Sequence, residues 1–328
     1  MEEWMDLGQL GLSEQELFSL APAQPGKAEH ISAPAYSYWS GVFRVFFQKK
    51  TNLLLLILLG IIVAFTYLYP AVIGYDSAVD PYINLLDPDA RHLKPAQAME
   101  KFGPGLKWIL GTGASGQSTF DAVWYGASIS LSLALICAAI NMTVGVAVGL
   151  VWGYSQRVDR VMTEVYNVVA NVPYILLIAV IVLILSASFW SMVFALTVTG
   201  WLGVAYFIRT QVMILRNREY NLASRCLGTP LYRIALKNIL PFMTSVIVML
   251  LAAELPSYIS YEVFLSFIGM GLEDRSLGKL IESSQSAMLT PGWELEFWSP
   301  VAVASVITVV LYVVGQNLAD ASDPRTHL

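Results

Sequence analysis

Charged side chains are scarce in this sequence of 328 residues. Asp, Glu, Lys and Arg make up 13% of it and apolar residues 56%, and the mean hydropathy is +0.60. Soluble domains carry roughly a quarter charged residues, so this composition excludes an ordinary soluble domain and predicts an integral membrane protein. The formal net charge of −5 says little about partners, because the distribution of the few charges matters more than their sum.

Cysteine and histidine are also rare. The two cysteines, Cys137 and Cys226, fall in segments that we place at different levels of the membrane, so we expect neither a disulfide nor a CxxC metal site. His30, His92 and His327 are scattered through loops or tails, where a solvated imidazole is expected rather than a metal ligand. The sequence therefore predicts no metal and no cofactor bound by this chain.

A nucleotide-binding motif is missing too. No G-x-x-x-x-G-K-[ST] occurs, so this chain cannot hydrolyse ATP through a P-loop of its own. The apolar runs contain neither a cluster of His or Cys nor a paired catalytic motif, which argues against an intramembrane enzyme.

Long apolar runs are abundant. A helix needs about 20 apolar residues to cross a bilayer, and the six runs that meet this length lie at about 53–73, 123–152, 161–187, 189–215, 241–268 and 298–318. The fold class predicted is an all-α integral membrane protein with six transmembrane helices. Its parts are a polar tail (1–50), the first span (51–73), an outer segment (74–122), a five-span core (123–320) and a short tail (321–328).

The distribution of lysine and arginine orients these spans. Six basic residues fall on the segments placed outside, namely Arg91, Lys94, Lys101, Lys107, Arg275 and Lys279, and all the others fall inside. Cytoplasmic loops carry the excess of positive charge. Both tails are therefore predicted to be cytoplasmic.

A charged island, Arg216–Pro241, separates the fourth and fifth runs. Asn217 is a good N-cap, Gly228 can close a helix in the left-handed conformation, and Pro230 prevents continuation. These signals predict a short helix at 218–227. Ten residues rise only about 15 Å, about half a hydrocarbon core, so this helix lies across a surface and does not cross the membrane.

The short helix is predicted to be amphipathic. At 100° per residue, one arc holds Tyr220, Leu222, Ala223, Cys226 and Leu227 with Glu219 as the exception, and the other holds Arg218, Asn221, Ser224 and Arg225. An apolar arc on a surface helix predicts a partner that covers it.

The order of residues in this island resembles the "EAA" signature of permease subunits of binding-protein-dependent ATP-binding-cassette importers. The family pattern is Glu-Ala-Ala, three residues, Gly, and a distal Leu-Pro. This chain has Ala223, Ser224, Gly228 and the pair Leu240-Pro241, and departs with Leu222 where the family usually has Glu.

Other segments resemble the C-type permease of the dipeptide and oligopeptide branch. They are Leu265–Gly271 and Asp320–Arg325, and the similarity runs from about residue 110 to residue 325. The segment Leu110–Leu131 is also similar, although Gly113, Gln117, Ser118 and Ser128 stand where the family places charges. A plain glycine-rich turn that enters the second span is an equal alternative there.

The resemblance implies a type I importer permease fold whose island is a coupling helix between spans 4 and 5. It implies contact with a cytoplasmic ATPase through Arg218, Glu219, Tyr220, Leu222, Ala223, Ser224, Leu227, Gly228 and Pro241. It also implies a second, B-type permease, two ATPases that bind ATP and Mg, an extracytoplasmic peptide-binding protein and a bacterial plasma membrane, with no nucleic acid. The cargo is open between peptides and the nickel or glutathione of close relatives.

Ionisable residues in the spans are candidates for the transport path, because charge in the membrane costs at least about 2.5 kcal/mol and must face protein or water. Glu164, Arg209, Glu254 and Glu262 are of this kind. Glu254 and Glu262 lie about 80° apart on one helix, so both could border one aqueous path, or they could cap or pair within the bundle. If they relay ions, an ion-driven secondary transporter is the alternative function.

Helix-breaking and small residues complete the pattern. Pro173 and Pro256 are expected to interrupt the third and fifth spans, and such interruptions neighbour the transport path in the family that the chain resembles. Gly145 and Gly149 form a G-x-x-x-G pair that permits close helix contact.

Overall fold

The computed structural model describes residues 38–76, 79 and 87–323. The chain divides into two compact units, Met1–Ser40 and Gly41–Leu328. The expected tail features before residue 38, including His30, lie outside the described residues, as do Arg325 and His327. Within the described part of the second unit, the regular elements are helices, with one isolated bridge between Thr112 and Ser118.

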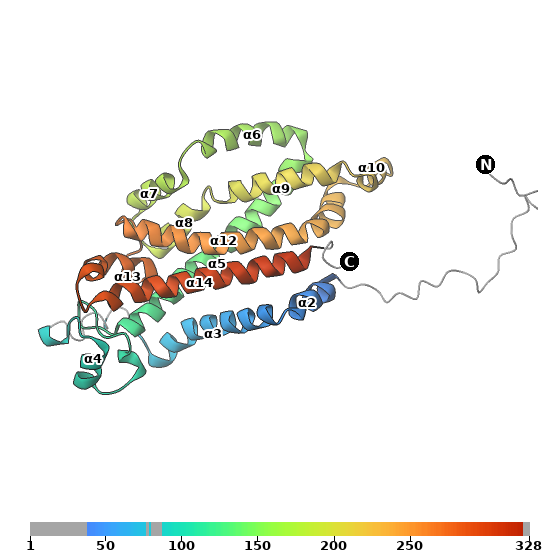
Figure 1. The fold of residues 1–328 in the computed structure, drawn as a ribbon. Coiled ribbons are helices and arrows are strands. Elements are labelled where there is room, and N and C mark those ends of the chain that lie inside the picture. Colours follow the sequence, from blue (N-terminus) through green and yellow to red (C-terminus); the bar gives the residue numbers. More distant parts are fainter. Residues whose placement is uncertain (1–37, 77–78, 80–86, 324–328) are drawn as a thin grey trace, which may run out of the picture. The chain divides into compact units, whose positions relative to one another are not determined.

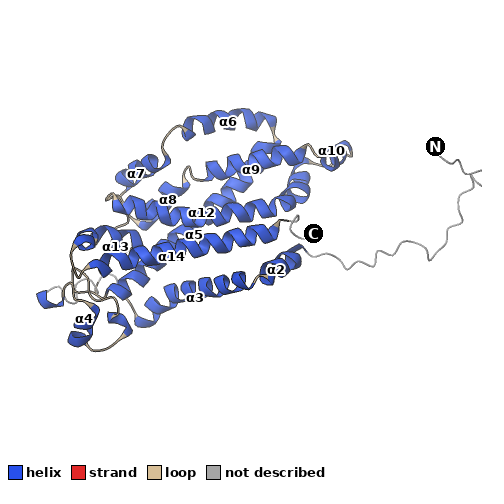
Figure 2. Cartoon of the chain, viewed as in Figure 1, coloured by secondary structure: helices blue, strands red, loops and turns tan. Residues whose placement is uncertain are grey.

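Long helices alternate with short ones along the chain (Figures 1 and 2). The α-helices are α2 (Tyr38–Gln48), α3 (Lys50–Ile73), α4 (Pro95–Phe102), α5 (Thr119–Tyr154), α6 (Gln156–Ala170), α7 (Tyr174–Leu185), α8 (Phe189–Thr197), α9 (Trp201–Arg216), α10 (Glu219–Cys226), α11 (Leu231–Arg233), α12 (Thr244–Phe267), α13 (Leu277–Ser283) and α14 (Glu294–Ser322). A π-helical turn, Ile234–Ile239, and a 3₁₀ turn, Leu240–Met243, join α11 to α12. Further 3₁₀ turns lie at Pro88–Ala90, Leu106–Trp108 and Gln285–Leu289.

The expected set of spans is present. In the described residues, five helical segments are long and apolar enough to cross a membrane, and α6 with α7 makes a sixth if the bent pair is one span. The longest single helix, α5, has 36 residues and rises about 54 Å, well beyond a hydrocarbon core of about 30 Å. Ser118 caps its start, because the Ser118 hydroxyl accepts a hydrogen bond from Asp121 N.

The third span is broken where proline predicts it. Helix α6 ends at Ala170, Pro173 is the N-cap of α7, and the two helix axes differ by 79°. Proline cannot donate the hydrogen bond that would continue the helix, and it disfavours helical backbone in the residue before it. The predicted interruption at Pro173 is confirmed.

The fifth span is not broken at Pro256, so that prediction is wrong. Helix α12 continues from Thr244 to Phe267 with Pro256 buried inside it. Packed neighbours and small adjustments let membrane helices retain an internal proline. A short turn that sequence reasoning missed lies in the fourth span, where Val198–Gly200 separates α8 from α9 within the single candidate span Phe189–Arg216.

Helix α5 packs closely on α9 through glycines. A side chain added at Gly145 would meet Val204 at 2.6 Å, and one added at Gly149 would meet the carbonyl oxygen of Ala205 at 2.7 Å. Gly153 continues the series one turn later, where an added Cβ would lie 2.7 Å from Arg209 O. The predicted close contact at the G-x-x-x-G pair is confirmed and extends over three turns.

Replacing Gly149 by leucine is therefore expected to destabilise the bundle by about 3 kcal/mol, since overpacking against backbone forces α5 and α9 apart. The same change at Gly60 is the control, because that glycine lies in α3 with nothing within 4 Å of an added Cβ. The effect is measured as the fall in the temperature at which the detergent-solubilised protein ceases to be monodisperse. Equal melting of the two variants would contradict this packing account.

The helix ends gather at two levels of the bundle. Figure 1 shows α10 at the same end as the start of α3 and the C-terminal end of α14, whereas α4 and α13 lie at the opposite end. The island, the start of α3 and the end of α14 therefore lie at the same end of the helical bundle.

Candidate functional site

The charged island forms the short helix that the sequence predicts. Helix α10 runs from Glu219 to Cys226, with Glu219 in the first turn and Arg225 in the last, where the helix dipole favours each charge. The expected N-cap was wrong: Arg218 has the extended cap conformation, whereas Asn217 ends α9. A backbone hydrogen bond closes the turn between α9 and α10, because Arg218 N donates to Leu215 O at 3.1 Å. Helix α10 therefore begins one residue later than predicted.

The apolar arc of α10 is open to its surroundings. Tyr220, Leu222 and Leu227 are exposed, Leu227 to 86%. The helix is held by its polar side instead, because Asn221 is 0% exposed and its Nδ2 donates to Leu215 O at 2.9 Å. An exposed apolar face on an anchored helix offers a docking surface.

The remaining predicted coupling residues also lie at this surface. Arg218, Glu219, Ala223, Gly228 and Pro241 are exposed, and Ser224 is half-buried with its hydroxyl donating to Tyr220 O at 2.8 Å. Exposed apolar side chains continue past α10 at Leu231, Tyr232, Leu236 and Phe242. The Phe242 ring lies 5.8 Å from that of Tyr220. Phe242 and the α11 residues were missed, because they lie beyond Pro230 in other elements and outside the helical arc of α10.

Gly228 closes α10 in the left-handed conformation that the sequence predicts, with a φ of +77°. Thr229 N donates to Ser224 O at 3.1 Å and Gly228 N to Arg225 O at 3.0 Å, which satisfies carbonyls at the helix end. An added Cβ at Gly228 would meet nothing within 4 Å. Glycine is therefore favoured there by backbone conformation and not by space.

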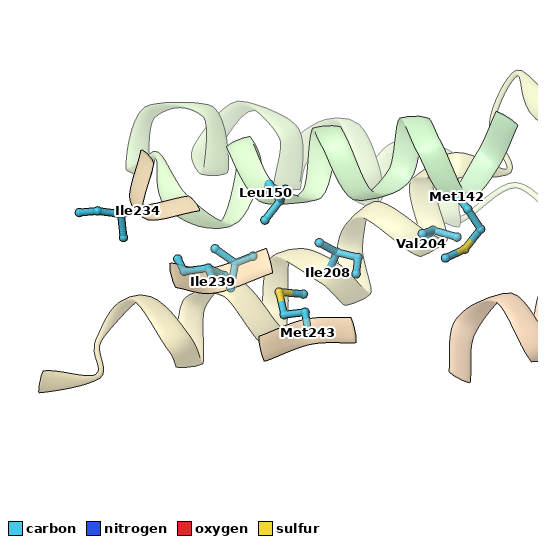
Figure 3. Close-up of a cluster of buried hydrophobic side chains, with 8 residues drawn as sticks. Met142, Leu150, Val204, Ile208, Ile234, Ile239 and Met243 are labelled. Atoms are coloured by element: carbon cyan, nitrogen blue, oxygen red, sulfur yellow. The ribbon is translucent and has the colours of Figure 1, made fainter. Parts of the chain in front are cut away.

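The segment after α10 inserts into the bundle core. Ile234, Ile239 and Met243 are buried and pack with side chains of α5 and α9, among them Leu150 and Ile208 (Figure 3). Interdigitated apolar side chains transmit displacement because they leave few voids. The segment that follows α10 is therefore packed against the contact between α5 and α9.

A cavity of about 390 Å³ lies among the broken spans. Its lining comes from the α6–α7 break, the α8–α9 break and α12, and includes Tyr166, Val169, Ala170, Val172, Pro173, Tyr174, Leu177, Thr199, Gly200, Leu202, Gly203, Glu254, Tyr258 and Tyr261. Two of the four expected path residues, Glu254 and Pro173, are thus brought together. Pro256 is buried and Glu262 lies elsewhere, so neither is among the lining residues.

Glu262 sits at the centre of a buried polar cluster. Its carboxylate accepts hydrogen bonds from the hydroxyls of Ser130 at 2.8 Å and Ser266 at 3.0 Å, and from that of Ser276. Ser130 also accepts from Leu277 N at 3.1 Å, at the start of α13. The 80° separation from Glu254 thus directs the two carboxylates to different surroundings, and Glu262 joins α5, α12 and α13.

The other two ionisable candidates have ordinary surroundings. Arg209 pairs with Asp159 of α6 and lies 5.6 Å from the ring centroid of Trp152. Glu164 is exposed on α6. Neither lines the cavity.

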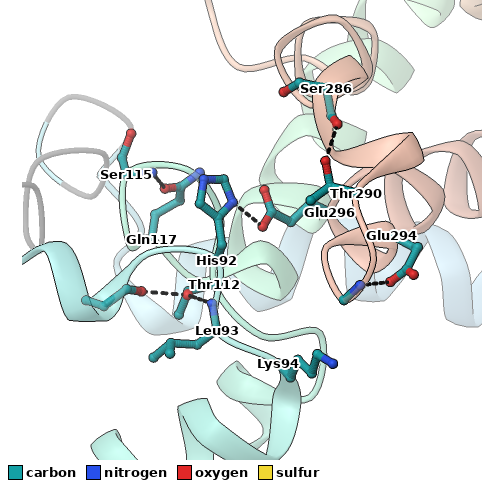
Figure 4. A network of polar contacts seen from close by, with 12 residues as sticks. His92, Leu93, Lys94, Thr112, Ser115, Gln117, Ser286, Thr290, Glu294 and Glu296 are labelled. Atoms are coloured by element: carbon teal, nitrogen blue, oxygen red, sulfur yellow. Dashed lines mark hydrogen bonds and ion pairs between the residues drawn. The ribbon is translucent and has the colours of Figure 1, made fainter.

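The outer segment is tied to the start of α14 by a residue expected to be solvated. His92 Nδ1 lies 2.6 Å from Glu296 Oε1, and the ring stacks on Trp293 at 3.6 Å (Figure 4). The prediction that the His92 imidazole is solvated is therefore wrong, because the ring is paired and stacked. Its partners lie about 200 residues away along the chain, beyond the reach of any local pattern.

The glycine-rich segment forms a turn that enters α5. Gly111 and Gly116 have positive φ, and an added Cβ at Gly111 would lie 2.2 Å from Leu93 O. Two of the uncharged residues in the predicted family positions have local roles: Ser118 caps α5, and Gln117 Oε1 accepts from Ser115 N at 2.9 Å. This geometry agrees with the alternative interpretation of the segment as a glycine-rich turn that enters the second span.

In the described part of the chain, no group of three or more His, Cys, Asp and Glu side chains lies close enough together to hold a metal ion. Cys137 is buried in α5 and Cys226 is exposed on α10.

Comparison with known proteins gives the class of this membrane protein. The family model described as "Binding-protein-dependent transport system inner membrane component" matches residues 145–328, which include α9, α10 and the cavity. The chain belongs to this family of transport permeases, and its helical bundle is the type I importer permease fold.

Individual relatives cover almost the whole chain. It is 43% identical over 316 residues to the oligopeptide transport system permease protein AmiD of Streptococcus pneumoniae, which spans 96% of this chain and 98% of that protein. It is 30% identical over 315 residues to the dipeptide transport system permease protein DppC of Bacillus subtilis, with 94% and 93% covered. The Bacillus subtilis oligopeptide permease OppC is 29% identical over 314 residues, with 95% and 97% covered.

Proposed function

We propose that this chain forms half of the translocation path of an ATP-driven peptide importer in a bacterial plasma membrane. The observation that carries the proposal is α10, a short helix anchored by buried Asn221 with its apolar residues Leu222 and Leu227 exposed. Its relatives are permeases named for oligopeptide and dipeptide transport. The remaining subunits are a second permease, two cytoplasmic ATPases that bind ATP and Mg, and an extracytoplasmic peptide-binding protein.

The proposed mechanism couples ATPase closure to the bundle. An ATPase cleft covers the exposed face of α10, and closure of the ATPase pair moves this helix. The buried side chains Ile234, Ile239 and Met243 carry that displacement to α5 and α9. The two permeases then rock and expose the path alternately to the two sides of the membrane.

An ion-driven secondary transporter is the competing function, and Glu254 is the observation in its favour. It is a carboxylate on a candidate span that lines a cavity, and ion relays use intramembrane carboxylates. An ion-driven protein has no need of an exposed docking helix, so α10 favours the importer.

Affinity purification of the tagged permease tests the proposed docking. ATPase subunits of the same importer are expected to co-purify with the native chain, and Leu227→Asp is expected to release them, because burial of a charge in the apolar contact is costly. Leu289→Asp is the matched control, since Leu289 is equally exposed, to 84%, but lies beyond α13. Retention of the ATPase by Leu227→Asp would contradict docking through α10.

Cysteine labelling tests the proposed orientation. In a Cys226→Ser background, Asp87→Cys is expected to react with an impermeant thiol reagent added to intact cells, whereas Asn217→Cys reacts only after lysis. Asp87 lies on the outer segment and Asn217 next to α10. Labelling of Asn217→Cys but not of Asp87→Cys in intact cells would show that the topology is the reverse of the one proposed.

A further inference from the structure

The break between α6 and α7, the turn between α8 and α9 and the cavity form a single feature within the candidate spans. Helix α6 gives way to α7 around Pro173, and α8 to α9 around Gly200, and both positions line the cavity. Irregular backbone within the membrane is tolerated only where it is buried in protein or lines an aqueous cavity. The volume of about 390 Å³ is that of a small-molecule site.

Glu254 gives this cavity its charge. It is the eleventh of the 24 residues of α12, about 15 Å from the helix start, and therefore near mid-span. Among the described residues that line the cavity, Glu254 is the one carboxylate, and no lysine or arginine accompanies it. Three tyrosines, Tyr174, Tyr258 and Tyr261, lie around it.

A hydrogen-bond chain fixes two of these tyrosines at the cavity. Asn141 Nδ2 donates to Leu196 O at 3.1 Å and to the Tyr258 hydroxyl at 2.6 Å, and since Leu196 O can only accept, the amide orientation is set. The Tyr258 hydroxyl accepts from Asn141, so its own hydrogen remains available for donation in the cavity that Tyr258 and Glu254 both line. The hydroxyl of Tyr174 donates to the same Leu196 O at 2.7 Å.

Gly200 makes this arrangement possible. An added Cβ would lie 2.4 Å from Leu196 O, 2.5 Å from Asn141 Nδ2 and 3.0 Å from the Tyr174 hydroxyl. Leu196, Asn141 and Tyr174 are therefore held close together at the cavity. A carboxylate has about four acceptor positions, so Glu254 can accept hydrogen bonds from a ligand.

We propose that this cavity binds the amino-terminal ammonium group of the peptide as it crosses the membrane, with Glu254 as its ion-pair partner and the tyrosine rings beside it. An ammonium group is attracted both to a carboxylate in low dielectric and to aromatic faces. The peptide's carboxylate is repelled, so the cargo enters with one end defined. A peptide with a free amino terminus carries this group whatever its sequence, and most of the remaining lining is apolar. The inference rests on the proposed function, because it requires a peptide cargo.

Photocrosslinking of cargo in the reconstituted complex tests the proposal. Two alanine tetrapeptides carry a diazirine side chain on the first or the last residue, and both are irradiated during turnover before mass spectrometric mapping. The first-residue probe is expected to label α7 and α12 around Tyr174 and Glu254, and the last-residue probe to label other segments.

Variants then assign the effect to the carboxylate. Glu254→Gln is expected to lower first-residue labelling at least about tenfold, the usual contribution of a hydrogen bond to a charged group. Glu164→Gln, an exposed carboxylate of α6 outside the cavity, is expected to match the native protein. Equal labelling around Glu254 by both probes, or labelling that Glu254→Gln leaves unchanged, would overturn the proposal.

Uptake measured in parallel separates this inference from the function on which it rests. If uptake requires ATP but labelling shows no end preference, the ammonium site is wrong and the importer stands. If the native complex takes up these peptides without ATP, the proposed function is overturned, whatever the labelling.

Discussion

Peptide uptake by the assembled importer is expected to fall about tenfold when Gly228 is replaced by valine. The φ of +77° at Gly228 lies in the left-handed region, where a side chain costs about 1–2 kcal/mol and a β-branched one is disfavoured further. Relief of that strain rotates the end of α10 and moves Leu227 out of its docking position. ATP hydrolysis by the complex should lose its dependence on cargo while the permease still inserts.

Gly74→Val provides a matched control for backbone strain. Gly74 ends α3 with a φ of +61°, and an added Cβ would again meet nothing within 4 Å. This variant carries comparable strain at the opposite end of the bundle from α10, so its ATPase coupling should remain native. Cargo-stimulated hydrolysis that is normal in Gly228→Val, or lost equally in both variants, would contradict the coupling role of α10.

Loss of the Glu262 carboxylate is expected to destabilise the permease by about 3 kcal/mol or more. Glu262→Ala leaves the hydroxyls of Ser130, Ser266 and Ser276 in the core without their acceptor, and each unsatisfied buried group costs about 1–3 kcal/mol. The residue before α13, Ser276, also loses its hydrogen bond to α12, whereas Leu277 N still donates to Ser130 of α5. The melting of the detergent-solubilised protein measures this loss.

Glu254→Ala is the contrasting variant on the same helix. It removes a carboxylate that lines a cavity, where water can replace it, so melting should change by less than about 1 kcal/mol while cargo transport falls. Equal destabilisation by the two variants would show that Glu254 is structural, and a stable Glu262→Ala protein would contradict the cluster's role.

Much of the fold could be predicted because membrane spans depend on local composition. About 20 apolar residues are sufficient to indicate a span, and all six predicted runs correspond to the helical spans, with α6 and α7 taken together. Gly228 and Pro173 act on their own backbone, so their effects could also be predicted from sequence.

The errors arose where tertiary packing decides. Pro256 is buried inside a continuous α12, whereas the turn at Val198–Gly200 contains no proline and lies next to Leu196 O, which accepts hydrogen bonds from Asn141 and Tyr174. The pairing of His92 with Glu296 joins residues 204 positions apart. Such partners cannot be inferred from one sequence without spatial information.

The site shows the same division. The sequence indicated Glu254 and Glu262 alike as membrane carboxylates, and only the structure separates the one that lines a cavity from the one that serine hydroxyls enclose. The tyrosines carried a signal that could have been used, because Glu254, Tyr258 and Tyr261 lie at i, i+4 and i+7 on one helix face. Tyr174 and Asn141 come from other helices and carried none.

The energy source of uptake tests the central claim most directly. The permease pair, reconstituted in proteoliposomes with the binding protein, should accumulate peptide only when ATP and separately purified ATPase subunits are present, and collapse of the proton gradient should have no effect. Glu254→Gln should lower the rate without changing this requirement. Uptake that runs on a proton gradient without ATP, and is abolished by Glu254→Gln, would contradict the importer and establish the ion-driven transporter.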